Sequence, residues 1–160
     1  MKRQKLLSGR TWIFALACAL LPMAAPAQEV AATGPSLYER LGGLAPISVV
    51  VSDFIDALVV DAELNANPAI DAARKRVPAA YLKYHVTALV CQATGGPCTY
   101  QGRAMKESHA HLNITEKEWD RMVVVFQQIL ARHSVPAAET AELLAIVGST
   151  KADIVMPSSS

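Results

Sequence analysis

His109 is the side chain in this sequence that is best placed to bind a metal. It follows a polar, glycine-containing loop and precedes Thr115-x-x-Glu118, a capping box that predicts the start of a helix. A neutral imidazole at such a junction can approach a metal centre, including the iron of a haem, without a long helix having to fit around the ring. The competing interpretation is that His109 is an ordinary core or surface histidine, as most histidines are.

Two further histidines offer other arrangements. His111 lies two residues after His109, so on a helical turn it points to roughly the opposite side, and we expect it at the surface or against a haem propionate. His109, His111 and His133 could instead contribute to a zinc site. Zinc needs three or four convergent ligands, and no Cys-x-x-Cys or His-Glu-x-x-His pattern supports such a set.

Apolar residues at helical spacing predict an all-α domain with four substantial helices and short accessory turns. The expected long helices cover about residues 46–59, 78–93, 116–130 and 136–147, and glycine pairs at 42–43 and 95–96 interrupt the chain. We expect one short turn over residues 37–41, an irregular segment or one short helix over residues 65–76, and one helical turn around His109. The sequence contains no β-hairpin signal, internal repeat or phosphate-binding glycine loop.

The first 27 residues have the pattern of a cleavable signal peptide. Four Lys and Arg side chains precede residue 11, and residues 12–23 form an apolar run too short to span a bilayer. Ala25-Pro26-Ala27 offers a small-x-small site, so we expect cleavage after Ala27; an uncleaved membrane anchor is the alternative. Residues 28–35 then form a linker, residues 36–156 the folded domain and residues 157–160 a tail.

The chain beyond the signal segment is mildly acidic. Four of the 15 Lys and Arg lie within the first 27 residues, whereas none of the 14 Asp and Glu does. The lack of a basic cluster argues against nucleic acid as a partner, and signal cleavage leaves no membrane partner. Cys91 and Cys98 either form a disulfide, as an oxidising compartment allows, or remain two unpaired thiols. Neither belongs to Cys-x-x-Cys-His, so nothing indicates covalent c-type haem attachment.

The region around His109 resembles the group I truncated haemoglobins. The family carries a Tyr-x-Gly-x-x-Met loop, a histidine four residues after the methionine, and an Ile-Thr pair at the fifth and sixth positions after the histidine. In this chain these residues are Tyr100, Gly102, Met105, His109, Ile114 and Thr115. The two glycine pairs, the opening at residues 36–43 and the stretch Val49-Val50-Val51-x-Asp53-Phe54 resemble the family as well. The resemblance covers about residues 36–155.

This resemblance implies a two-over-two helical sandwich around a non-covalent haem b, with His109 as the axial iron ligand. It implies that Phe54 and Met105 belong to the haem pocket. The candidate partners of the propionates, each of which is otherwise a surface side chain, are Arg103, Lys83 and Tyr100.

The gas-binding side departs from the family pattern. Ile55 stands where many relatives have a tyrosine, and Leu82 and Val86 stand where glutamines are frequent, so the usual tyrosine–glutamine network to bound oxygen is not expected. Asn67-Pro68 stands where relatives usually have a phenylalanine pair that wedges the porphyrin. His85 lies at the edge of the same helix face. It either binds the iron as a sixth ligand, as in some cyanobacterial and algal relatives, or lies at the pocket rim.

The sequence thus predicts an exported, monomeric haem protein, periplasmic or secreted, that reversibly binds oxygen, nitric oxide or carbon monoxide. One alternative is an enzyme, a nitric oxide dioxygenase or a peroxidase. Such an enzyme would need an external reductase, because the chain has no flavin or nicotinamide motif. The other alternative is a helical protein that keeps the fold without haem.

Overall fold

The computed structural model describes residues 34–157. The predicted signal segment, its cleavage site, nearly all of the linker and residues 158–160 of the tail lie outside the described residues. Within residues 34–157 every regular element is a helix, which confirms the all-α prediction. The helices are α1 (Leu37–Arg40), α2 (Leu44–Val60), α3 (Ala62–Asn65), α4 (Pro68–Arg76), α5 (Ala79–Ala93), α6 (Met105–His109), α7 (Glu116–Arg132), α8 (Ala137–Gly148) and α9 (Lys151–Ile154).

Local sequence signals set most of the helix starts. Ser36 and Glu39 form a capping box at α1, and Thr115 and Glu118 form the predicted one at α7. The backbone N–H of Leu64 donates to the carboxylate of Asp61, which caps α3. Prolines at positions 78 and 136 stand at the N-caps of α5 and α8, as expected of residues that suit a helix start.

The segment of residues 65–76 is more regular than the sequence predicts. Asn67-Pro68 reads as a turn signal, yet Asn67 caps α4 with its side chain and Pro68 is the first helical residue. Because proline at the first position needs no N–H partner, the same dipeptide that indicates a turn also begins a nine-residue helix. Helix α9, which precedes the predicted tail, is also absent from the sequence prediction.

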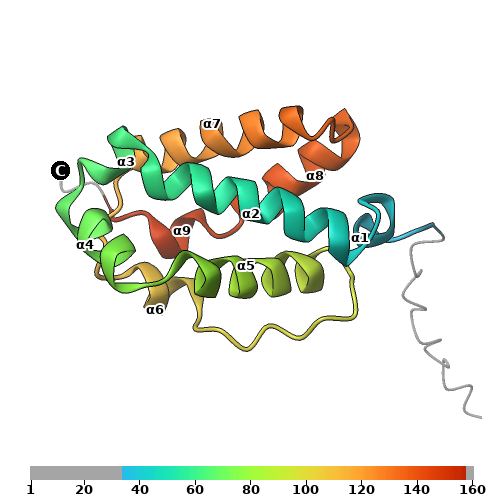
Figure 1. The fold of residues 1–160 in the computed structure, drawn as a ribbon, viewed down its shortest axis with the longest axis horizontal. Coiled ribbons are helices and arrows are strands. Elements are labelled where there is room, and N and C mark those ends of the chain that lie inside the picture. The colour runs from blue at the N-terminus through green and yellow to red at the C-terminus, as the bar shows by residue number, and fades with distance from the viewer. Residues whose placement is uncertain (1–33, 158–160) are drawn as a thin grey trace, which may run out of the picture. The chain divides into compact units, whose positions relative to one another are not determined.

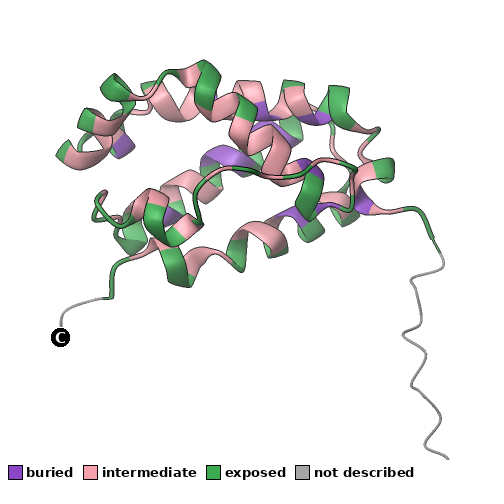
Figure 2. Ribbon diagram, turned by 90° about the horizontal axis from the view of Figure 1, so that it is seen from below, coloured by how far each residue is buried: buried purple, intermediate pink, exposed green. Residues whose placement is uncertain are grey.

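Helix α2 is the centre of the packing. It lies between α5 and α7, and it contacts both along much of its length (Figure 1). Ile47, Val51 and Ile55 on α2 are buried against α5, and the rings of Phe54 and Phe126 join α2 to α7 with their centroids 5.0 Å apart. A second cluster gathers buried residues of α1, α7 and α8: Leu37, Phe126, Leu130 and Leu143. Figure 2 marks the buried residues along these helices in purple.

The C-terminal segment supports the short helix α6. Helix α9 packs against α6, and the backbone N–H of Met156 donates to the carbonyl of Ile114 at 2.8 Å. Lys151 at the start of α9 pairs with Glu116 at 2.5 Å, and its ammonium lies 5.9 Å from the centre of the Trp119 ring. Helix α9 and Met156 therefore pack against the segment that carries His109.

None of the helices within residues 34–157 combines the length and apolar character needed to cross a bilayer.

Candidate functional site

His109 is the last residue of α6, and its ring is half-buried. Its Nδ1 lies 2.8 Å from the carbonyl oxygen of Met105, one helical turn earlier. A carbonyl only accepts, so Nδ1 carries the proton and donates it. Nε2 then keeps its lone pair, and within residues 34–157 the structure gives it no hydrogen-bond partner. This is the tautomer in which Nε2 is the metal-binding atom.

Burial lowers the pKa of the His109 imidazole below its usual value. The hydrogen bond to Met105 opposes this effect, and the nearby His111 adds to it. The neutral ring is therefore favoured at neutral pH, and a neutral ring is what an iron ligand requires.

An apolar surface gathers the residues predicted for the gas-binding side. Ile55 is 5% exposed and belongs to the α2 cluster, and half-buried Leu82 and Val86 of α5 pack against that cluster together with Phe54. The structure therefore brings these four predicted residues together. A neutral imidazole with a free Nε2 is the donor that a haem iron requires, and apolar side chains such as these suit a porphyrin, so the chemistry of the residues present fits the group.

His85 lies among three tyrosine rings on the flank of α5. Its ring centroid is 4.3 Å from that of Tyr81, 5.1 Å from that of Tyr84 and 6.2 Å from that of Tyr100. Tyr81 and Tyr84 belong to α5 itself, whereas Tyr100 comes from the loop before α6. No signal in the sequence indicated this aromatic group, because the approach of Tyr100 depends on how the loop folds back.

The loop between α5 and α6 is tied back to α5 at two points. Cys91 and Cys98 form a disulfide with their Cα atoms 5.7 Å apart, which decides between the two predicted alternatives. Two residues later, the N–H of Tyr100 donates to the side chain of Gln92 at 2.6 Å. These ties run the loop alongside α5, so Tyr100 reaches His85.

The three candidate propionate partners differ in their present contacts. Lys83 pairs with Asp56 of α2 at 2.7 Å. The hydroxyl of Tyr100 donates to the backbone carbonyl of Arg103 at 2.8 Å, and burial raises the pKa of that phenol. The side chain of Arg103 is exposed. Of the three side chains, that of Arg103 is therefore the most accessible to a propionate.

Neither His111 nor His133 joins His109 in a common set of metal ligands within the described residues. His111 is exposed in the turn after α6, at the predicted surface position. Nε2 of His133 lies 2.8 Å from a carboxylate oxygen of Asp53, which joins the end of α7 to α2. No three His, Cys, Asp or Glu side chains in the described part of the chain converge on a common point, so the zinc arrangement has no donor set there.

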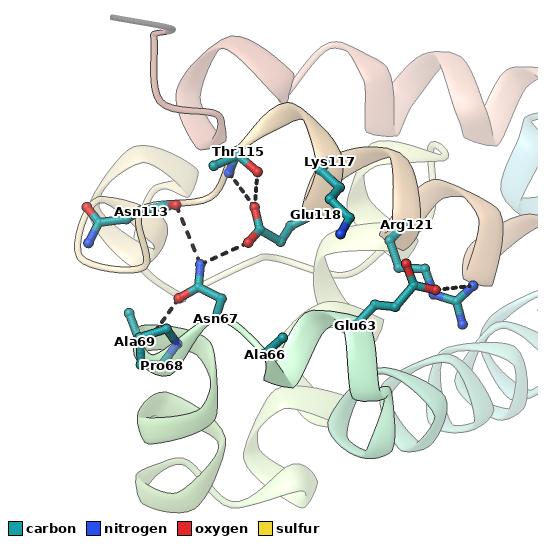
Figure 3. A pocket seen from close by; sticks show the side chains of 10 residues that line it. All are labelled: Glu63, Ala66, Asn67, Pro68, Ala69, Asn113, Thr115, Lys117, Glu118 and Arg121. Carbon is teal, nitrogen blue, oxygen red and sulfur yellow. Dashed lines mark hydrogen bonds and ion pairs between the residues drawn. The ribbon is translucent and has the colours of Figure 1, made fainter.

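Asn67 has a role that sequence reasoning missed. Its side chain joins the start of α4 to the turn between α6 and α7 and to Glu118 (Figure 3). Burial alone would raise the pKa of Glu118, but hydrogen bonds from Thr115 and Asn67 outweigh it and lower that pKa. These residues line a cavity of about 430 Å³ between α3–α4 and α7. The departure at Asn67 was visible in the sequence, but its partner lies 45 residues further along the chain.

Comparison with known proteins identifies the family of this chain and several of its relatives. Residues 36–156 match the family described as bacterial-like globin. The group 1 truncated hemoglobin LI410 of Chlamydomonas moewusii is 24% identical over 84% of this chain and 82% of its own length. The group 1 truncated hemoglobin GlbN of Synechocystis is 28% identical over 71% of this chain and 90% of its own.

Solved structures match as well. The truncated hemoglobin of Tetrahymena pyriformis, in its Fe(III) form, has a TM-score of 0.66 at 21% identity, covering 76% of this chain and 98% of that one. The 2/2 hemoglobin of Synechococcus, a structure with covalently attached heme, has a TM-score of 0.66 at 24% identity over the same shares. The predicted truncated-globin fold is thereby confirmed. The chain belongs to the bacterial-like globin family, with group 1 truncated haemoglobins among its relatives.

Proposed function

We propose that the chain holds a haem b through Nε2 of His109 and thereby reversibly binds a diatomic gas, namely oxygen, nitric oxide or carbon monoxide. The observation that carries this proposal is the bond from Nδ1 of His109 to the carbonyl of Met105, because it leaves Nε2 as the free donor atom. Membership of a globin family and the group 1 truncated relatives support it. The haem supplies an iron atom with a position for the gas.

In this proposal the chain's own residues orient the His109 ring and make the gas-binding side apolar. The Met105 carbonyl holds the His109 ring in one orientation about its donor atom. Ile55, Leu82 and Val86 supply an apolar surface without hydrogen-bond donors. A bound oxygen would therefore depend on few donors, and we expect it to leave faster than from relatives that keep a tyrosine and glutamines there.

The haem is bound without a covalent link in this proposal. Both cysteines near the site are joined to each other, so neither thiol is free for attachment. Extraction with acidified butanone is expected to remove the haem completely. Haem that stays with the protein would instead indicate an attachment of the kind named for the Synechococcus structure.

Paired alanine substitutions test the role of His109. His109→Ala is expected to abolish haem retention or shift the Soret band, because it removes the donor atom. His111→Ala is the matched control, since His111 is exposed two residues away, and it is expected to leave the spectrum unchanged. The opposite pattern would overturn the assignment. A wild-type protein that shows no Soret band after haem reconstitution would favour a helical protein that keeps the fold without haem.

We also propose that the protein is exported to the periplasm or beyond the cell and begins at Gln28. The Cys91–Cys98 disulfide supports this, because such bonds persist in oxidising compartments. Mass spectrometry of protein from a Gram-negative host is expected to find a chain that starts at Gln28 and weighs about two mass units less than its reduced form. A soluble cytoplasmic product with an intact Met1 would contradict the proposal.

A further inference from the structure

Asn67 has both ends of its amide engaged. Its Oδ1 accepts from the backbone N–H groups of Ala69 at 2.9 Å and Ile70 at 3.4 Å, which caps α4. Because the oxygen is committed to the cap, the NH₂ group must point the other way. It is directed at the turn between α6 and α7 (Figure 3).

The NH₂ group of Asn67 reaches the middle of that turn and the first turn of α7. It donates to the carbonyl of Leu112 at 3.0 Å, with longer contacts to the carbonyl of Asn113 at 3.5 Å and to the Glu118 carboxylate at 3.4 Å. The turn bends sharply here, since Asn113 has a left-handed backbone with φ of 50°. One side chain from the α3–α4 corner, residues 66–67, therefore holds the segment that connects His109 to α7.

The path from Asn67 to His109 is short. The N–H of Leu112 donates to the carbonyl of His109 at 2.9 Å, and the carbonyl of the same Leu112 accepts from Asn67. A shift of the turn would thus be passed to the backbone of His109 through a single residue, Leu112. It would move the ring, because the rest of α6 is only one helical turn long.

Few other links connect the α3–α5 side of the site to the α6 side. Helix α5 packs mainly on α2, and α6 mainly on α9. The disulfide and the Gln92–Tyr100 bond join α5 to the loop, but they do so at the C-terminal end of α5. Asn67 makes its links before the N-terminal end of α5, so the two sides are tied at both ends.

We propose that Asn67 is a positioning residue for the haem ligand, because its amide ties the α3–α4 corner to the turn that follows His109. This inference rests on the proposed binding of haem by His109. It gives Asn67 a polar role at the place where a porphyrin-wedging phenylalanine pair would otherwise be expected.

Two substitutions of Asn67 distinguish the loss of its bonds to the turn after α6 from the loss of its cap on α4. Asn67→Asp keeps the capping oxygen, loses the donor and places a carboxylate opposite Glu118. Asn67→Ser keeps a capping oxygen without added charge, but its hydroxyl is too short to reach Leu112. Asn65→Ser is the matched control, because Asn65 donates to the Val59 carbonyl at 3.2 Å and so loses a bond that stays on one side of the site.

Haem release and the iron–histidine bond are the measurements. Both Asn67 variants are expected to transfer haem to apomyoglobin about 5-fold faster than the wild type, the factor that corresponds to one lost hydrogen bond. The iron–histidine stretching band of the deoxy ferrous protein is expected to shift or split in resonance Raman spectra. Asn65→Ser is expected to change the release rate by less than about 2-fold and to leave the band in place.

A role in capping alone would leave Asn67→Asp like the wild type in both measurements, and that result would overturn the inference. Amide hydrogen exchange of residues 110–115 in the haem-free protein is a second test, with faster exchange expected in both Asn67 variants. Unchanged exchange would also overturn the inference. A wild type that binds no haem would overturn the proposed function instead, and the exchange rates would still show whether the tie exists.

Discussion

The ring of Tyr100 lies directly against the backbone of Gly102. A Cβ atom added to Gly102 would come within 3.0 Å of several atoms of that ring, so no side chain fits there without moving the tyrosine. The hydroxyl of the same tyrosine donates to Arg103, and its ring faces His85. The Tyr-x-Gly pattern in the sequence is therefore a packing requirement of the loop that leads to His109.

Gly102→Ala is expected to destabilise the protein by about 1–3 kcal/mol, the usual cost of forcing atoms into a packed site. Displacement of Tyr100 should break its bond to Arg103 as well. Gly148→Ala is the matched control, because Gly148 ends α8 with no atom near its missing Cβ. That change is expected to be neutral or to stabilise by up to about 1 kcal/mol. Urea denaturation curves of the two variants measure their free energies of unfolding. Equal losses of unfolding free energy in the two variants would contradict the packing argument.

Asp61 and Arg121 link α3 to α7 and give stability that depends on pH. The Asp61 side chain is 7% exposed, and Nε and Nη2 of Arg121 lie 3.0 and 2.7 Å from one of its oxygens. Arg121 lowers the pKa of Asp61 below its ordinary 3.8. A lowered pKa means that the contribution is present above pH 3.8 and is lost as the pH falls through the folded-state value.

Asp61→Asn is therefore expected to cost about 1–3 kcal/mol at pH 7, and the difference from the wild type should shrink below pH 3.8. Denaturation at a series of pH values measures both effects. Glu63→Gln serves as the control, because Glu63 is 53% exposed and lies 3.3 Å from the same guanidinium. Its effect is expected to stay below about 1 kcal/mol at every pH. A constant penalty for Asp61→Asn across the pH range would show that the charge is unimportant.

The disulfide is expected to stabilise the protein by about 2.5 kcal/mol, the loop-closure value for a bridge between residues seven apart. Cys98→Ser removes the bridge and leaves Cys91, which is fully buried, as an inert thiol. Dithiothreitol should lower the unfolding midpoint of the wild type to that of Cys98→Ser and should not change the variant. A wild type unaffected by the reductant would show that the bond does not form.

Local signals in the sequence predict the fold well where they are strong. The capping box at Thr115 and the prolines at positions 78 and 136 mark helix starts that the structure reproduces. The weaker cases are α3, α4 and α9, since each is short and takes its stability from contacts with other helices. For the same reason the sequence could not show the reach of Asn67 to Leu112 or the pairing of Lys83 with Asp56.

His85 is the residue for which the sequence leaves open two roles, sixth iron ligand or pocket rim. Its ring is in contact with Tyr81 and Tyr84 on its own helix and with Tyr100 on the loop. Aromatic contacts of this kind are each worth about 0.5–1.5 kcal/mol, and ligation of iron would have to replace any of them that it breaks. We therefore expect His85 to stay at the rim, with a five-coordinate deoxy ferrous iron in the wild type.

The spectrum and kinetics of two variants test this expectation. His85→Leu should leave the iron five-coordinate and speed oxygen release only if His85 donates to the bound gas. Tyr100→Leu is the informative companion, because it removes the contact made by the loop while keeping His85. If His85 competes for the iron once it is freed, this variant should show a six-coordinate low-spin ferrous spectrum, and the double variant should return to five-coordinate. A six-coordinate wild type that becomes five-coordinate in His85→Leu would show instead that His85 is the sixth ligand despite its three tyrosine neighbours.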